Sequence, residues 1–221
     1  KIAMVMAMAD TGFPLCLRAF VFGKSRDKDN KQVYAQAMKF FIIFTLVAFL
    51  SVMFYLDILR HIIGRDYWPG LRVVPIVMAA EIFMGIYFNL SFWYKLIDET
   101  RWGAYFSLIG CTILVVMNIL LIPRFSYMAC AWAGFTGYGV AMLLSYFVGQ
   151  KKYPIQYDLK SIGRYVLLAA ALYVAAEYVA IENIYLRMAF RTLLLCVFIA
   201  YIVKRDLPLN QIPVINRFIR K

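Results

Sequence analysis

Residues 38–56 have the sequence MKFFIIFTLVAFLSVMFYL, in which Lys39 is the one charged side chain. A helix of this length, with a rise of 1.5 Å per residue, extends about 28 Å and so matches the hydrocarbon thickness of a bilayer. A stretch this long and this apolar predicts a membrane-spanning helix.

Other apolar runs of similar length lie on both sides of this stretch. In chain order the runs cover residues 2–22, 38–56, 71–94, 103–122, 129–148, 162–181 and 184–203, and a basic tail covers 204–221. We therefore predict an all-α polytopic membrane helix bundle with about seven transmembrane helices.

The composition supports a membrane protein and argues against a nucleic-acid-binding one. Of the 221 residues, 64% are hydrophobic and 16% are charged, and the mean hydropathy is +0.72. Soluble domains are about half apolar and a quarter charged, so lipid must solvate part of this chain. The net charge of +12 lies in short loops between apolar runs rather than in one basic stripe, which excludes nucleic acid as a partner.

Side chains suited to catalysis or metal binding are sparse. The four cysteines lie in apolar runs without CxxC spacing, and His61 is the one histidine, so we predict no metal site and no cofactor. The sequence has no recognisable set of nucleophile, base and acid, and we do not expect an enzyme.

Lys and Arg are divided unequally between the two ends of the predicted helices. Sixteen lie in the tail and in the connections that share its side, and six lie on the opposite side. Since basic residues concentrate in cytoplasmic loops, we place the C-terminus in the cytoplasm. The chain begins inside an apolar run, so we expect an N-terminal part of a longer protein to precede Lys1.

The run 129–148 has one face without bulky side chains. The small residues that recur there at every fourth position are Ala129, Ala133, Gly137, Ala141 and Ser145. Because apolar side chains gain little by leaving lipid tails, close backbone approach drives helix association in a membrane. The stripe predicts a tight helix–helix seam, with a sliding surface for a rocking lobe as the alternative.

Charged and amide side chains inside the predicted spans are the candidate functional residues, because such groups usually face a bundle interior or a wet cavity. Asp10 and Arg18 flank Pro14, which is expected to kink the first helix and open a cavity. The alternative is that each charge extends to its nearer interface. Glu81 lies eight residues before Asn89 and suits a cation or proton site, or a hydrogen bond from a protonated acid.

Structural roles are expected for several other polar groups. Asn118 is predicted to make an interhelical hydrogen bond, and Glu177 an ion pair with Arg191 on a neighbouring helix. The turn near residue 98 is bracketed by Trp93, Tyr94, Lys95 and Trp102. This mixture predicts an interfacial aromatic belt, with sugar stacking as the alternative.

Several longer stretches resemble one protein family. They are VFGKSRDKDNKQVYAQAMKFF (21–41), GIYFNLSFWYKLIDETRWGAYFSLIG (85–110), NILLIPRF (118–125), AWAG (131–134) and SYFVGQKKYPIQYDL (145–159). Together they closely resemble the C-terminal half of bacterial polysaccharide flippases of the O-antigen type. These flippases belong to the superfamily of multidrug, oligosaccharidyl-lipid and polysaccharide exporters. The resemblance is closer between residues 20 and 160 than in the last two helices.

The resemblance implies a transporter with two lobes of six helices followed by two more helices. Residues 1–148 would form the C-terminal lobe, incomplete at its start, with two additional helices in 149–203 and a basic cytoplasmic tail in 204–221. The missing N-terminal lobe of the same protein and the membrane lipids would be its partners. The implied substrate is an undecaprenyl-diphosphate-linked oligosaccharide, moved across the bacterial inner membrane and coupled to a cation gradient.

The resemblance also suggests roles for the intramembrane residues. Arg18 and Asn89 would line the substrate cavity, and Asp10 and Glu81 would take part in cation coupling. Residues 13–22, FPLCLRAFVF, depart from the family, in which an acidic residue often precedes the aromatics. The alternatives are a multidrug exporter of the same superfamily with an acidic cavity, a membrane enzyme of polysaccharide assembly, or a membrane scaffold without transport activity.

Overall fold

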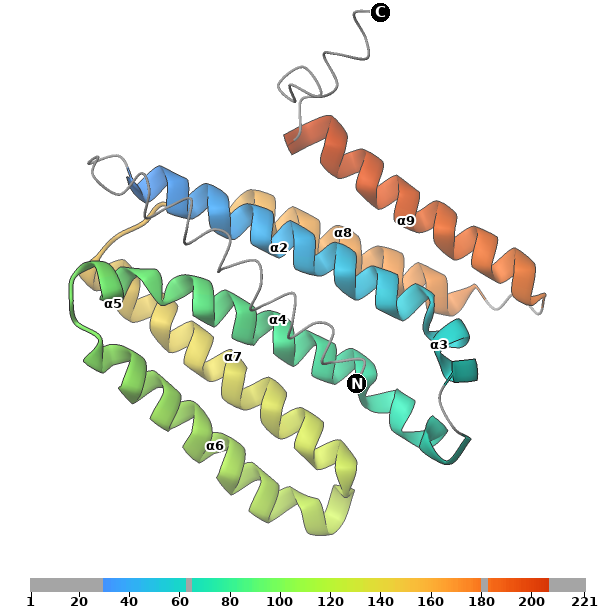
Figure 1. The fold of residues 1–221 in the computed structure, drawn as a ribbon, viewed down its shortest axis with the longest axis horizontal. Coiled ribbons are helices and arrows are strands. Elements are labelled where there is room, and N and C mark those ends of the chain that lie inside the picture. The colour runs from blue at the N-terminus through green and yellow to red at the C-terminus, as the bar shows by residue number, and fades with distance from the viewer. Residues whose placement is uncertain (1–29, 63–64, 180–182, 207–221) are drawn as a thin grey trace, which may run out of the picture.

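The computed structural model of this chain describes residues 30–62, 65–179 and 183–206, and these residues form an all-α helix bundle (Figure 1). The predicted first helix, 2–22, and most of the basic tail lie outside the described residues. The elements in chain order are α2 (Asn30–Phe54), α3 (Leu56–Ile62), the 3₁₀ helix η1 (Arg65–Val73), α4 (Val74–Leu90), α5 (Phe92–Leu96), α6 (Arg101–Phe125), α7 (Tyr127–Lys152), α8 (Leu159–Tyr178) and α9 (Ile184–Asp206).

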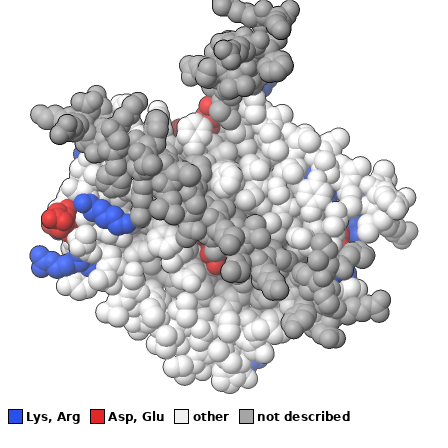
Figure 2. Space-filling model, viewed as in Figure 1, with Lys and Arg blue, Asp and Glu red and all other residues white. Residues whose placement is uncertain are grey.

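Six helical segments of the described part are long and apolar enough to cross a membrane. They are Lys31–Phe54, Trp68–Leu96, Arg101–Phe125, Tyr127–Lys152, Leu159–Tyr178 and Ile184–Asp206. The chain is therefore a multi-pass membrane protein, and the predicted helices from residue 38 onward are confirmed. Figure 2 agrees, because the described surface of this face is mostly neutral and most of its charged side chains lie toward its edges, with one acidic patch near the middle.

The helix boundaries differ from the predicted ones in the run 71–94 and near Pro123. The run 71–94 is divided among η1, α4 and α5, and Pro75 lies in the first turn of α4, where a missing N–H leaves no helical hydrogen bond unmade. The prediction that the next helix ends before Pro123 is wrong, since α6 continues to Phe125. Ser126 alone, with φ of 51°, separates α6 from α7.

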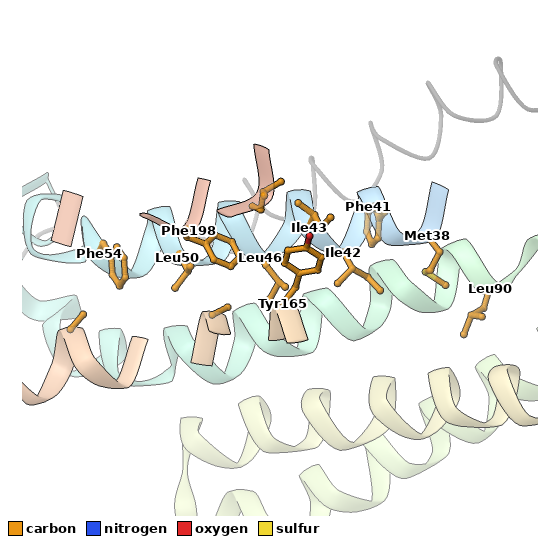
Figure 3. Packing of buried hydrophobic residues seen from close by; sticks show 13 residues of the cluster. Met38, Phe41, Ile42, Ile43, Leu46, Leu50, Phe54, Leu90, Tyr165 and Phe198 are labelled. Atoms are coloured by element: carbon orange, nitrogen blue, oxygen red, sulfur yellow. The ribbon is translucent and has the colours of Figure 1, made fainter. Parts of the chain in front are cut away.

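The helices form two groups that meet along α2 and α4 (Figure 1). In one group α7 packs between α4 and α6, and in the other α2 packs against α8 and α9. Figure 3 shows the apolar cluster on α2, in which Phe41, Leu50 and Phe54 are almost fully buried and meet Tyr165 of α8 and Phe198 of α9. The apolar side chains of α2 thus pack against both other helices of the second group.

The predicted seam on α7 is confirmed. Every residue of the small-residue stripe is buried, and so is Gly149, the next position in the series. A Cβ built on Gly137 would lie 3.0 Å from the carbonyl oxygen of Gly110 on α6, and one built on Gly110 would lie 3.1 Å from that of Gly137. The two backbones approach so closely that a side chain at either position would have to displace a backbone carbonyl by a few tenths of an ångström.

Replacing Gly137 by alanine should lower the thermal unfolding temperature of the purified protein. The new methyl group would press on a backbone carbonyl, and overpacking of this kind destabilises by about 1–3 kcal/mol. This exceeds the gain of up to about 1 kcal/mol that alanine brings to a helix interior.

The matched control is Gly134→Ala on the same helix, where a Cβ would meet no atom within 4 Å. It should leave the unfolding temperature unchanged or raise it. Equal unfolding temperatures for the two variants would contradict the seam.

Candidate functional site

Glu81 is the candidate site residue that the structure places inside a membrane span. It lies two turns into α4, within the apolar segment Trp68–Leu96, and its side chain is half-buried. None of the ion pairs and hydrogen bonds among the described residues involves it. A carboxyl group at such a position marks a functional site more often than a surface charge does, because its burial in hydrocarbon is costly.

Helix α7 packs beside Glu81 and supplies Tyr138, which lies close enough to the carboxyl group to interact electrostatically. The two helices are held in register by Phe83 of α4 and Phe135 of α7, whose ring centroids are 4.9 Å apart. Gly139 makes room for this contact, since a Cβ there would lie 3.3 Å from the Phe83 ring. The sequence did not single out Tyr138, because nothing in its spacing distinguishes it from the other tyrosines of the chain.

The remaining candidate residues are not gathered around Glu81 by the described helices. Asn89 lies two turns further along α4, is buried, and donates from Nδ2 to the carbonyl oxygen of Gly85 at 3.1 Å. Its amide therefore bonds within its own helix. Asp10 and Arg18 lie outside the described residues.

A cluster of charges joins α9 to α3. Arg191 donates from Nη1 to Oδ2 of Asp57 at 2.9 Å and to the carbonyl oxygen of Phe54 at 3.2 Å. Arg187 Nη2 lies 3.2 Å from the same Asp57 oxygen. The predicted pair of Glu177 and Arg191 is wrong, because Asp57 takes the place of Glu177, which is exposed near the end of α8.

A second polar cluster joins three helices at the other end of α9. Lys39 of α2 lies 2.5 Å from Oδ1 of Asp206, and the Tyr165 hydroxyl of α8 donates to Oδ2 of the same carboxylate. The side chains of Lys39 and Asp206 are 19% and 11% exposed, so the pair is largely shielded from water. The sequence analysis placed Lys39 at the start of the predicted span 38–56 and did not anticipate its partners.

Two further structural predictions from the sequence are wrong. The interfacial belt is wrong for Trp93 and Tyr94, which are buried against Phe106, and Trp93 donates from Nε1 to Ser145 at 3.4 Å, whereas Lys95 is exposed and Trp102 partly exposed. The carbonyl oxygen of the Asn118 side chain is buried without a hydrogen-bond partner, so the expected interhelical bond is missing there.

The turn between α5 and α6 carries an exposed ion pair. Glu99 accepts a hydrogen bond from Trp102 Nε1 at 2.7 Å and pairs with Lys152 at the end of α7. These bonds to the carboxylate hold the pKa of Glu99 below its ordinary value, with Lys152 making the larger contribution. The pair ties the turn to α7.

Comparisons with known proteins leave the family open. No protein-family model matches the chain, no curated protein matches it, and no solved structure matches it. Among the described residues, no group of three His, Cys, Asp or Glu side chains is placed to hold a metal ion. The resemblance to polysaccharide flippases stays a prediction from the sequence.

Replacing Tyr165 by phenylalanine should lower the unfolding temperature of the purified protein. The change leaves a carboxylate oxygen of Asp206 without its donor in a shielded position, and a hydrogen bond to a charged group contributes about 1.5–3 kcal/mol. The matched control is Tyr201→Phe on α9, which removes an exposed hydroxyl that accepts from Arg205. A loss of stability as large in the control would contradict a special role for the buried cluster.

The Glu99 pair should stabilise the protein at neutral pH and not in acid. A pKa lowered by folding gives stability that is present above the ordinary value of 4.5 and is lost as the pH falls through the folded value. Thermal unfolding of the wild type and of Glu99→Gln should therefore differ near neutral pH and converge in acid, below the lowered pKa of Glu99. Lys152→Gln should converge with the wild type in the same way, whereas a gap that persists in acid would rule out this linkage.

Proposed function

We propose that this chain is part of a cation-coupled membrane transporter that moves an undecaprenyl-diphosphate-linked oligosaccharide across the bacterial inner membrane. The observation that carries the coupling is Glu81, a half-buried carboxyl group inside a span with no ion pair among the described residues. Such groups take part in ion and proton pathways of membrane proteins. The substrate class rests on the resemblance of residues 21–159 to polysaccharide flippases.

The arrangement of α4 and α7 supports a role for Glu81 in a conformational cycle. Its helix is the member of the α4–α6–α7 group that also packs on α2 of the other group. A cation or proton bound there would change the charge at the junction of the groups. If the two arrangements of the helix groups bind the cation or proton with different affinity, its binding shifts the equilibrium between them.

A cation-coupled multidrug exporter is the second candidate. It is favoured by the acidic character of Glu81, because cationic drugs suit a cavity with negative charge. The proposed location, with the basic tail in the cytoplasm, is the same for both.

Glu81→Gln in the full-length protein should abolish surface polysaccharide in cells that depend on it, since an amide cannot take up a cation or proton. Lipid-linked oligosaccharide should then accumulate on the cytoplasmic side of the membrane, with the membrane abundance of the protein unchanged. Glu81→Asp keeps the charge and should retain part of the activity.

Glu177→Gln is the matched control, because Glu177 is an exposed carboxylate near a helix end and should be replaceable without loss. The resemblance extends the test to Arg18→Ala, which should also abolish surface polysaccharide. Normal surface polysaccharide in cells carrying either Glu81→Gln or Arg18→Ala would refute the proposed flippase function. Loss of drug resistance with normal polysaccharide would favour the exporter.

A further inference from the structure

One face of α8 is turned away from the helices beside it. Ser161, Tyr165 and Ala169 are buried on the side where α8 packs on α2 and α9. The opposite side is exposed along the whole helix, and only 22% of the apolar window of α8 is buried. Its exposed residues recur at intervals of three and four and are Lys160, Arg164, Leu167, Ala171, Val174 and Tyr178. The described bundle leaves this stripe uncovered.

The stripe begins with two cations that lie one helical turn apart. Lys160 and Arg164 are both exposed, and Arg164 donates from Nε to the carbonyl oxygen of Lys160 at 3.2 Å. This bond holds the guanidinium group over the turn that carries Lys160. Neither side chain forms an ion pair with a described residue. The amino group of Lys160 and the two Nη atoms of Arg164 are therefore open to a ligand at the surface.

The acidic residue next to this pair is engaged by the backbone of the helix. Asp158 precedes α8, and its carboxylate accepts a hydrogen bond from the N–H of Ser161 at 3.2 Å. The positive end of the helix stabilises a carboxylate at this position. Arg164 lies close enough to Asp158 to interact with it electrostatically, but the two form no ion pair. Asp158 thus leaves the donors of both cations available to a second anion.

The position of the two cations indicates which anion is at hand. Lys160 and Arg164 lie in the first two turns of the span Leu159–Tyr178, which is the depth of the lipid headgroups. The stripe continues toward the middle of the membrane with apolar side chains, of which Leu167 is 71% and Val174 48% exposed. A phospholipid has the matching order of groups, with a phosphate at the surface and apolar tails directly below it. Basic residues at the membrane end of a helix attract anionic lipids in this way.

We propose that the outer face of α8 binds an anionic phospholipid. Lys160 and Arg164 contact the phosphate, and one acyl chain lies along Leu167, Ala171 and Val174. The guanidinium group can donate to two phosphate oxygens at once, whereas the lysine acts as a point charge. This site is independent of Glu81 and of the transport activity proposed above.

The test uses the full-length protein in mixed micelles, with phosphatidylglycerol, phosphatidylcholine or inorganic phosphate as the probe. Native mass spectrometry should show that phosphatidylglycerol binds more tightly than phosphatidylcholine. Lys160→Gln and Arg164→Gln should each weaken the binding of phosphatidylglycerol about fivefold, and the double variant should lose the preference over phosphatidylcholine. Both residues are exposed, so the unfolding temperatures without added lipid should equal that of the wild type.

The matched control is Arg101→Gln, because Arg101 is an exposed single cation at the start of α6, another helix with an exposed apolar face. It should retain the wild-type affinity for phosphatidylglycerol.

Equal affinity of the wild type for the two lipids would overturn the proposal, and so would wild-type binding by the double variant or an equal loss in Arg101→Gln. Inorganic phosphate should not raise the unfolding temperature, and stabilisation as strong as that by phosphatidylglycerol would overturn the lipid as the occupant. If the double variant does not fold, each single variant decides by itself, since unchanged binding in both would contradict a role for the two cations.

Discussion

The hydrocarbon of a bilayer offers no hydrogen bonds to a crossing backbone, so the peptide groups of each span must bond within their own helix. All six described spans obey this constraint as continuous or nearly continuous helices. The same environment removes the usual driving force for association, because lipid tails solvate apolar side chains as well as a protein interior does. What holds the helices together must therefore be close backbone packing or polar contact, and the two groups of helices differ in which they use.

The α4–α6–α7 group relies on close approach and the α2–α8–α9 group on polar contacts at helix ends. Gly110 and Gly137 bring α6 and α7 together without any ion pair between these helices in the described part. Only 11% of the apolar window of α9 is buried inside the bundle, the same share as in α6, but α9 has charged partners near both ends. Asp206 holds one end of α9 and Asp57 the other. Charge-assisted bonds in shielded surroundings are strong enough to offset so small an apolar contact.

The spans and the small-residue seam could be predicted, because they depend on the sequence of one helix. Contacts between side chains of different helices could not, because they depend on which helices become neighbours. Apolar length gave the spans, and the spacing of small residues gave the seam on α7. The partner of Arg191 depends on the turn of α3, which carries Asp57 to α9 and leaves Glu177 outside. The burial of Trp93 likewise depends on Gly149 of α7, where a Cβ would lie 2.8 Å from the indole nitrogen. No pattern within one helix encodes either contact.

Three acidic residues lie in the described spans, namely Glu81, Glu177 and Asp206. Glu81 differs from the other two in its surroundings. Glu177 lies in the last turn of its helix and is exposed, and Asp206 ends its helix and pairs with Lys39. Each of these two has a local means of tolerating its charge. Glu81 lies two turns inside its helix, and the described helices bring it a tyrosine but no cation. A carboxyl group that has no ion pair among the described helices can gain or lose a cation or proton without breaking a structural pair there, and this is the property that ion coupling requires.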